Sequence, residues 1–288
     1  MKIYLDCWPC FMRQALSAAR RAGAPPAQQR EILEETMAQL QALAAAATPP
    51  ELGERIHRLV RERTRHPDPY LESKRAATAQ ALTLYPELKA RVQGAADPLE
   101  TAVRIAIAGN IIDYGAAEHF DLVETLERVL TAPLAGGGMP ALRHAISAVD
   151  AVLYLADNAG ETVFDRVLID TLGVPVAYAV KAGPVLNDAT RTEAEAAGLH
   201  TVAEVIDTGS DAMGAPLMLC SPAFRRRFDG AALIIAKGQA NYETLSAVSA
   251  PICFLLQAKC GVVADDLGVA TGSVVVKAAA ALARFPAA

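Results

Sequence analysis

The chain has 288 residues, of which 52% are hydrophobic and 5% aromatic, with a formal net charge of -5 at pH 7. The length suits one large domain or two closely associated ones, the charge offers no footprint for nucleic acid, and no run reaches the ~18 apolar residues of a membrane span. No signal peptide is evident and the five cysteines are an odd count, so we expect a cytoplasmic protein with reduced thiols.

The first part of the chain, from Phe11 to about Thr131, shows helical periods with almost no strand-like alternation. Several segments begin with Pro, and Asp97 is followed three residues later by Glu100 in a capping-box pattern. The glycine-rich stretch at 135–140 is interpreted as a linker. We therefore predict an all-helical N-terminal region over residues 1–135 and an α/β domain over residues 136–288.

Short apolar runs separated by helical periods follow the linker. They are rich in β-branched or long aliphatic residues and apolar on both faces, which favours a parallel sheet covered on both sides. The predicted strands span residues 151–156, 174–180, 200–206, 230–236 and 250–255. The predicted fold class is α/β, a doubly wound three-layer α/β/α sheet preceded by the helical region.

The strand ends collect polar residues, where ligands of such sheets bind. Asp157 and Asn158 follow the first predicted strand, and Asn187 with Asp188 comes after the second. Oxygen ligands of this kind suit a divalent cation such as Mg²⁺ or Mn²⁺. The alternative is a turn in which Asp157 and Asn158 cap the following helix.

A candidate phosphate site follows the third and fourth predicted strands. Lys237 and Gly238 stand at a helix start, where backbone N–H groups and an ammonium group could bind an anion. Thr208, Gly209 and Ser210 could add a nest of hydroxyl and amide groups. The alternative for Lys237 is an exposed loop residue. A cation site beside an anion site indicates a small phosphorylated metabolite as ligand.

Four motifs in this order resemble the metal-dependent damage-control phosphatases, a family long known only as a domain of unknown function. They are DNAGE, GPVLNDAT, DTGSDAMG and KGQANYE. The segments DCWPCFMRQAL and AGNIIDYG resemble the stand-alone prokaryotic branch. The resemblance covers nearly the whole chain and implies an α/β/α phosphatase domain behind a helical region that caps the site.

The resemblance also implies roles for individual residues. The implied metal ligands are Asp157, Asn158 and Asp188. Lys237 would bind the phosphate, and Glu161, one helical turn further on, would orient a metal-bound water or a substrate hydroxyl. Asn110 and Asp113 would reach the substrate from the helical part, although a polar pair at a buried helix end explains them equally well.

Two mechanisms of hydrolysis are compatible with these residues. Either a metal-activated water attacks phosphorus, or Asp157 attacks first and a phospho-enzyme follows. Metal-activated water is favoured, because Asp157 is more useful as a ligand and no His stands at a strand end to act as a base. Mn²⁺, Mg²⁺, Co²⁺ and Ni²⁺ all remain candidates for the divalent cofactor.

Cys7 and Cys10 form a C-x-x-C motif at the start of the first helix. As half of a zinc site they would need two further ligands, for which Cys253 and Cys260 are candidates if the N-terminus folds back. The favoured interpretation is two small buried residues one helical turn apart.

Two other classes of protein compete with the phosphatase. A sensor of phosphorylated metabolites would need the anion site without metal-dependent turnover. A methyltransferase, a role once proposed for an animal branch of the family, should carry a glycine-rich turn after its first strand. The DNAGE turn has one glycine and two acids, which counts against the methyltransferase.

Overall fold

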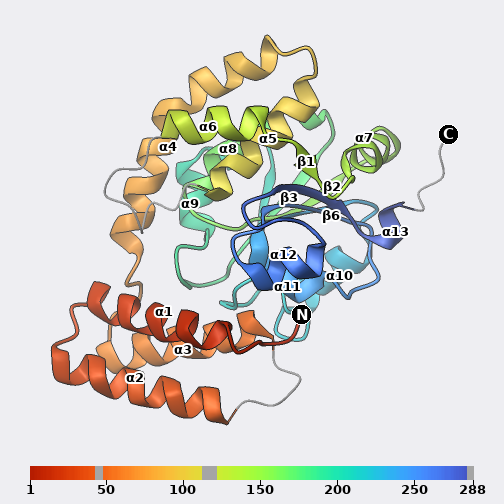
Figure 1. The fold of residues 1–288 in the computed structure, drawn as a ribbon. Coiled ribbons are helices and arrows are strands. Elements are labelled where there is room, and N and C mark those ends of the chain that lie inside the picture. The colour runs from red at the N-terminus through yellow and green to blue at the C-terminus, as the bar shows by residue number, and fades with distance from the viewer. Residues whose placement is uncertain (43–47, 112–121, 284–288) are drawn as a thin grey trace.

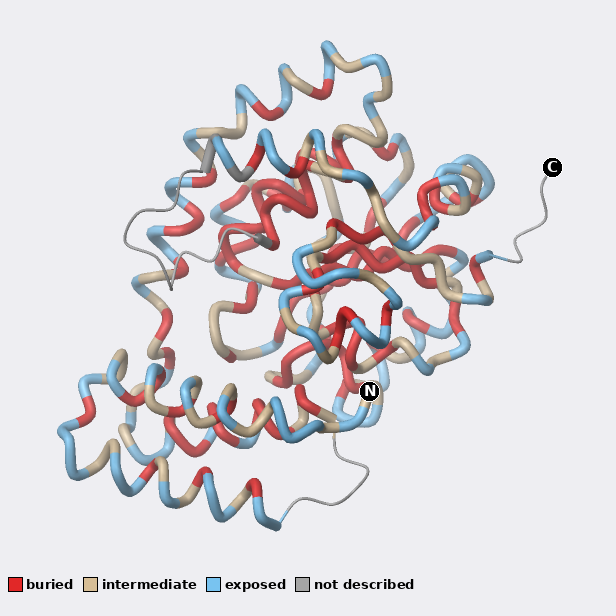
Figure 2. Tube along the Cα trace, in the orientation of Figure 1, coloured by how far each residue is buried: buried red, intermediate tan, exposed pale blue. Residues whose placement is uncertain are grey.

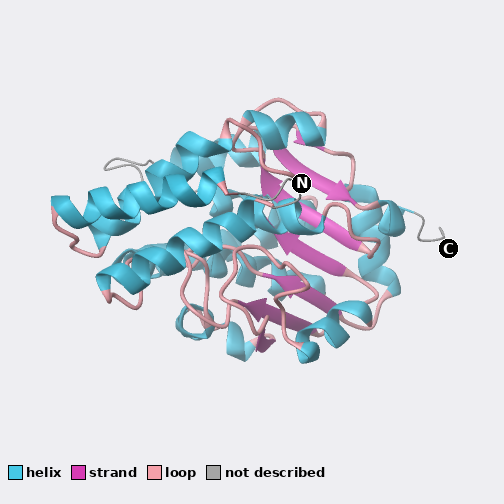
Figure 3. Cartoon of the chain, turned by 90° about the horizontal axis from the view of Figure 1, so that it is seen from below, coloured by secondary structure: helices cyan, strands magenta, loops and turns pink. Residues whose placement is uncertain are grey.

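A computed structural model describes residues 1–42, 48–111 and 122–283, and within them a seven-stranded sheet lies between helices (Figures 1 and 3). The strands are β1 (Leu134–Ala135), β2 (Val152–Leu155), β3 (Val176–Val180), β4 (Glu204–Asp207), β5 (Ile234–Lys237), β6 (Ile252–Gln257) and β7 (Val274–Ala278). Their spatial order is β1-β7-β6-β5-β2-β3-β4. All neighbouring pairs are parallel except β6 with β7.

Thirteen α-helices and one short 3₁₀ helix lie in the described residues. The first six precede the sheet's first strand: α1 (Cys7–Arg21), α2 (Pro26–Gln41), α3 (Pro49–Thr64), α4 (Leu71–Gln93), α5 (Pro98–Ile111) and α6 (Leu122–Thr131). The others are α7 (Met139–Ala148), α8 (Glu161–Leu172), α9 (Arg191–Ala196), η1 (Leu199–Thr201), α10 (Pro222–Asp229), α11 (Gly238–Leu245), α12 (Gly261–Leu267) and α13 (Ala280–Ala283).

The sheet has one hydrophobic core on each face, which confirms the three-layer α/β/α prediction. On one face Tyr154 and Tyr178 pack with side chains of α4, α5, α6, α7 and α8. On the other, Leu153 and Phe254 pack with α10, α11 and α12. Alternate residues of one strand enter opposite cores, because successive side chains of a strand point to opposite faces.

The helical N-terminal part divides between two cores. Helices α1, α2 and α3 pack on one another around residues such as Phe11, Ile32 and Ile56. Buried and exposed residues alternate along these helices (Figure 2). Helices α4, α5 and α6 instead belong to the layer on the sheet. Helix α5 packs along α8, so the last turn of α5 reaches the turn that follows β2.

The predicted linker at 135–140 needs a correction, because Ala135 is part of β1 and Met139 and Pro140 begin α7. Leu134 and Ala135 pair in parallel with β7, a strand that the sequence analysis did not predict. The backbone turns sharply at Gly136, where φ is +85° and a Cβ would come 2.6 Å from the Val276 carbonyl oxygen. Glycine is therefore required for close packing against β7.

The predicted third strand also begins later than expected. Residues 199–201 form the 3₁₀ helix η1, so His200 does not open a strand, and β4 begins only at Glu204. The other four predicted strands are present with ends shifted by up to four residues.

Candidate active site at the strand ends

The turns that follow β2 and β3 lie side by side at one edge of the sheet. The two strands pair in parallel, and beyond them Asn158 and Asp188 form an antiparallel bridge. The backbone N–H of Ala189 donates to the carbonyl oxygen of Asp157 at 2.8 Å. The structure thus brings together the two acid and amide pairs singled out in the sequence.

Three carboxylates are buried at this junction, namely Asp157, Glu161 and Asp188. Burial, followed by repulsion from Glu161 and Asp188, raises the pKa of Asp157 to about 8. Burial also raises the pKa of Asp188 to about 6, although the charges of Lys181 and Lys74 oppose that change. Ionised carboxylates are costly in this setting, and a bound cation would stabilise them.

Two asparagine amides bind these carboxylates. Asn110, from the last turn of α5, donates through Nδ2 to Asp157 Oδ2 at 2.6 Å and to Glu161 Oε2 at 3.0 Å. Asn158 donates to the same two oxygens at 3.0 and 3.1 Å. Asp157, Glu161 and Asp188 form an acid cluster, and Asn110 is hydrogen-bonded to two of its members. Asp113 lies outside the described residues.

Two side-chain oxygen atoms at this junction have no hydrogen bond in the described part of the chain. Asp188 Oδ2 and Asn110 Oδ1 are buried and have no hydrogen-bond partner, and Lys181 Nζ lies 3.7 Å from Asp188 Oδ2. No three His, Cys, Asp or Glu side chains among residues 1–42, 48–111 and 122–283 are arranged as a complete metal site. Two carboxylates and an amide nevertheless have the oxygen chemistry that a hard divalent cation accepts.

Lys237, the predicted phosphate ligand, lies inside the protein and not at its surface. It is fully buried, and its Nζ donates to Glu161 Oε1 at 2.5 Å, to Asp165 Oδ1 at 2.6 Å and to the Ala106 carbonyl oxygen at 2.9 Å. Burial alone would lower its pKa, but Asp165 and Glu161 outweigh burial and raise it. The three donors of the ammonium group are all in use.

Gly238 lies against the acid cluster, so it does not form an open anion cradle. Its φ is +78°, and a Cβ at this position would come 1.9 Å from Asp157 Oδ2. Asn241, from the KGQANYE motif, donates from Nδ2 to the carbonyl oxygens of Ala156 at 3.1 Å and Lys237 at 2.7 Å. These contacts tie the ends of β2 and β5 together.

The predicted nest after β4 satisfies its own polar groups. Thr208 Oγ1 donates to the Ser210 carbonyl oxygen at 3.0 Å, and the Gly209 N–H donates to Asp207 Oδ1 at 2.9 Å. Ser210 Oγ accepts a hydrogen bond from the Ala212 N–H at 3.1 Å. Gly209 and Ser210 nevertheless line a cavity, which is described below.

Two further lysines lie at strand ends and were not predicted as site residues. Lys181 directly follows β3, is buried, and donates to the Gly214 carbonyl oxygen. Lys259 comes two residues after β6 and is exposed, and its charge counteracts the rise in the pKa of Asp157. Both stand at the same kind of position that drew attention to Lys237, namely the polar residues after an apolar run.

The family model of the damage-control phosphatase ARMT1-like domain matches residues 3–275. The chain belongs to this family. Membership of a family of damage-control phosphatases supports phosphatase activity.

Related proteins match this family member over most of its length. A damage-control phosphatase of Pyrococcus horikoshii is 33% identical over 96% of the chain and 97% of its own length. A damage-control phosphatase of Archaeoglobus fulgidus is 37% identical over 78% of the chain and 81% of its own. An uncharacterized protein of Methanocaldococcus jannaschii is 33% identical over 94% of both chains.

A solved structure of the family confirms the fold. The crystal structure of a DUF89 family protein from Pyrococcus horikoshii has a TM-score of 0.89 and 31% sequence identity, and the match covers 97% of this chain and 99% of that one. Across the part that the structure describes, no helix of this family member is long and apolar enough to cross a bilayer.

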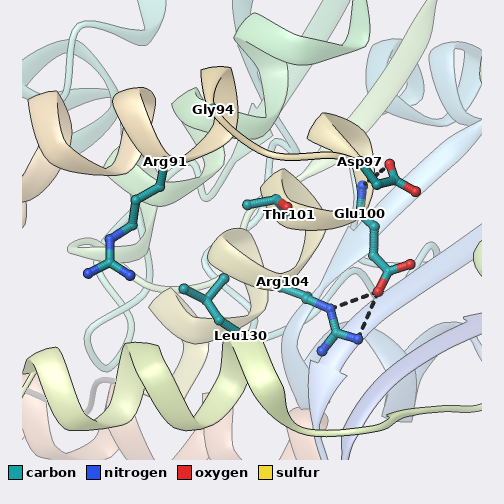
Figure 4. A pocket seen from close by; sticks show the side chains of 7 residues that line it. All are labelled: Arg91, Gly94, Asp97, Glu100, Thr101, Arg104 and Leu130. Atoms are coloured by element: carbon teal, nitrogen blue, oxygen red, sulfur yellow. Dashed lines mark hydrogen bonds and ion pairs between the residues drawn. The ribbon is translucent and has the colours of Figure 1, made fainter.

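Two cavities of this family member differ in their relation to the acid cluster. One of about 530 Å³ lies around the first turns of α5, at the other end of that helix from Asn110, and Arg104 is bound there to Glu100 (Figure 4). The other, of about 470 Å³, lies where the chain leaves β3 and β4. Its walls are formed by Glu54, Arg58, Ala182, Gly183, Gly209, Ser210, Asp211 and Leu219.

The C-x-x-C motif lies at the start of α1, as predicted, but its thiols are half-buried. The N-terminal segment does fold back onto α11, because the ammonium group of Met1 donates to the carbonyl oxygen of Glu243 at 2.7 Å. Burial raises the pKa of Cys7 in this segment. Cys253 is buried in β6, and all five cysteines are free thiols.

Proposed function

We propose that the chain is a metal-dependent phosphatase that hydrolyses small phosphorylated metabolites, such as sugar phosphates or damaged cofactor phosphates. Family membership supports the reaction. The observation that carries the metal dependence is the junction of Asp157 and Asp188, where two buried carboxylates meet and Asp188 Oδ2 lacks a hydrogen bond. Three buried carboxylates, Asp157, Glu161 and Asp188, face two buried ammonium groups, those of Lys181 and Lys237. A further cation would balance the remaining negative charge, and oxygen ligands favour a divalent one.

The proposed metal ligands are Asp157, Asn158 and Asp188, and the metal is Mg²⁺, Mn²⁺, Co²⁺ or Ni²⁺. An amide binds a cation through its oxygen, so Asn158 would present Oδ1 in place of the N–H group that it now directs at Asp157. A cation bound there would neutralise the carboxylates, polarise a water molecule and reduce the charge on the phosphoryl oxygens.

Glu161 is proposed as a positioning residue of this site. Its Oε2 accepts hydrogen bonds from Asn110 and Asn158, and its Oε1 accepts one from Lys237. Both carboxylate oxygens are thus in use, and the Asn158 N–H adds a further bond at 3.3 Å. The carboxylate of Glu161 therefore orients the amides that surround Asp157.

The proposed phosphate ligand is Lys259, in place of the predicted Lys237. The ammonium group of Lys237 is fully engaged, and contact with a phosphate would require it to leave Glu161 and Asp165. Lys259 is exposed at the same sheet edge, and its backbone N–H donates to Gln239 Oε1 at 3.3 Å. Gln239 directly follows Gly238, which lies against Asp157. A solvent-exposed ammonium near the acid cluster suits an incoming phosphate.

The cavity of about 470 Å³ is proposed to hold the rest of the metabolite. It lies at the ends of β3 and β4, and the turn after β3 carries Asp188. Gly209 and Ser210 form part of its wall, with the chain turning at Thr208. Glu54 and Arg58 of α3 also line the cavity, so the bundle of α1, α2 and α3 would act as a cap.

Phosphate release tests this function. Metal-stripped protein is assayed on a panel of sugar and cofactor phosphates, with Mg²⁺, Mn²⁺, Co²⁺ or Ni²⁺ added back, beside the Asp157→Ala variant. Turnover that requires metal and disappears in the variant is the expected result. Binding of phosphorylated compounds without turnover under any metal would overturn the proposal and favour a sensor.

A further inference from the structure

A second set of buried polar groups lies directly behind Glu161. Asp165 is one helical turn further along α8, is fully buried, and accepts three hydrogen bonds. Tyr154 donates its hydroxyl to Oδ1 at 2.7 Å, Tyr178 donates to Oδ2 at 2.7 Å, and Lys237 donates to Oδ1 at 2.6 Å. None of these four residues touches the junction of Asp157 and Asp188 through a hydrogen bond in the described structure.

The two tyrosines fix Asp165 from the sheet. Tyr154 of β2 and Tyr178 of β3 are register partners, and their rings stack with centroids 5.3 Å apart. Strand pairing and ring stacking thus fix the position of each hydroxyl, and each hydroxyl donates to a different oxygen of the Asp165 carboxylate. Buried carboxylates survive only when such partners satisfy them, and Asp165 has a partner on both oxygens.

Lys237 joins this set to the acid cluster. Its ammonium bridges Asp165 and Glu161, two carboxylates one turn apart on α8, and donates its third hydrogen bond to Ala106 of α5. Removing one partner of a buried ion pair leaves an uncompensated charge, so the position of Lys237 depends on both acids. The position of the Glu161 carboxylate depends in turn on Lys237.

We propose that Asp165, together with Tyr154 and Tyr178, positions Lys237 on Glu161 and thereby holds the carboxylate that orders the metal-binding amides. These residues act through Glu161 and touch neither metal nor substrate. The inference rests on the proposed function, because it assigns the set a purpose at that metal site. Residues that orient metal ligands from behind typically change metal affinity or activity by about 10–100-fold when altered.

Mn²⁺ affinity measured by electron paramagnetic resonance tests this role with a double-mutant cycle. The variants are Asp165→Asn, Glu161→Gln and the pair together. Asp170→Asn is a matched control, because Asp170 also lies on α8 and also accepts bonds from a tyrosine and a lysine, Tyr85 and Lys89, at the surface. Thermal melting of each variant shows that it is folded.

Asp165→Asn is expected to raise the Kd for Mn²⁺ about tenfold, whereas Asp170→Asn leaves it unchanged. In the Glu161→Gln background, Asp165→Asn should add no further loss, because its effect passes through Glu161. A purely structural residue would leave the Kd unchanged, or its effect would multiply with that of Glu161→Gln. Either result overturns the inference.

Tyr178→Phe replaces Asp165→Asn in the cycle if the latter does not fold, since it keeps the ring stacking and removes a single hydroxyl. The same criteria then apply with a smaller expected loss, about threefold. Wild-type protein that binds no Mn²⁺ and releases no phosphate would reject the proposed function itself. Wild-type binding with an unchanged Kd in the folded variant would reject the positioning role alone.

Discussion

The backbone of Gly238 lies in direct contact with the Asp157 carboxylate. A Cβ at position 238 would come 1.9 Å from Asp157 Oδ2 and 2.2 Å from Cγ. The residue has φ +78°, a backbone conformation that glycine adopts without strain. The first residue of α11 thus sets how far the Asp157 side chain can extend toward β5.

Gly238→Ala is therefore expected to displace Asp157 and to reduce kcat/KM by about 100-fold or more, since small misplacements at a reacting centre have effects of this size. Gly268→Ala is the matched control, because Gly268 has a similar φ of +69° but nothing within 4 Å of a Cβ. It should lose roughly 1 kcal/mol of stability and keep its activity. Equal activity in the two variants would contradict the contact.

Asp188→Asn should remove the stabilisation that metal gives to the folded protein. Ligand at a hundredfold excess over Kd adds about 2.7 kcal/mol to folding, which corresponds to about 5 °C in Tm for a chain of this size. The wild type should show this rise on addition of Mn²⁺, and the variant should not. Scanning calorimetry with and without metal is the measurement. A full Tm rise in the variant would place the metal elsewhere.

Lys259→Met is expected to raise KM for the phosphorylated substrate about tenfold with a smaller change in kcat, because an exposed ammonium contributes mainly to binding. Steady-state kinetics at two salt concentrations would show a weaker salt dependence in the variant. Lys89→Met removes a surface charge on α4, where the lysine binds Asp170, and serves as control. If both variants keep the wild-type KM, Lys259 does not meet the phosphate.

The stability of the folded protein should depend on pH through Glu243, independently of any metal. Burial raises the pKa of this α11 residue to about 7, and Gln239 opposes that rise through a 2.8 Å hydrogen bond. A carboxyl group with a raised pKa in the folded state binds its proton more tightly there than when unfolded. Its contribution to stability is thus complete below about pH 4.5 and is lost as the pH rises to about 7.

Chemical denaturation at several pH values compares the wild type with Glu243→Gln, which keeps the shape of the side chain. The free energy of unfolding of the wild type should fall relative to the variant between pH 4.5 and 7, by on the order of 3 kcal/mol. Exposed Glu195→Gln controls for the loss of a surface charge. A difference that grows in the opposite direction would show that Glu243 is stabilised as an anion.

The strand ends could be predicted from the sequence because their signals are local. Apolar runs marked β2, β3, β5 and β6, and the acid and amide residues directly after them marked the edge where ligands bind. Asp157 and Asp188 lie together because parallel neighbours end at the same edge. Strand β1 has only two residues, which is too short to give a recognisable apolar run. Strand β7 has a run of three valines that could have been predicted as a strand.

The side chain of Lys237 points into the protein, which was not predicted although the alternation of side chains along β5 indicates it. Lys237 follows Ile235 by two residues in β5, so both side chains point to the face that α8 covers. Asp165 was missed for a different reason, because it lies within the helical period after Glu161 and gains its meaning only from Tyr154 and Tyr178. Their hydroxyl contacts cross between β2, β3 and α8, which periodicity along the chain does not reveal.

Anomalous diffraction from crystals grown with Mn²⁺ would test the central claim most directly. The proposed site predicts an anomalous peak bonded to oxygens of Asp157, Asn158 and Asp188, with the peak lost in Asp157→Ala crystals. A peak at other residues, or none at these strand ends in protein that shows Mn²⁺-dependent phosphate release, would contradict the assignment of the metal site.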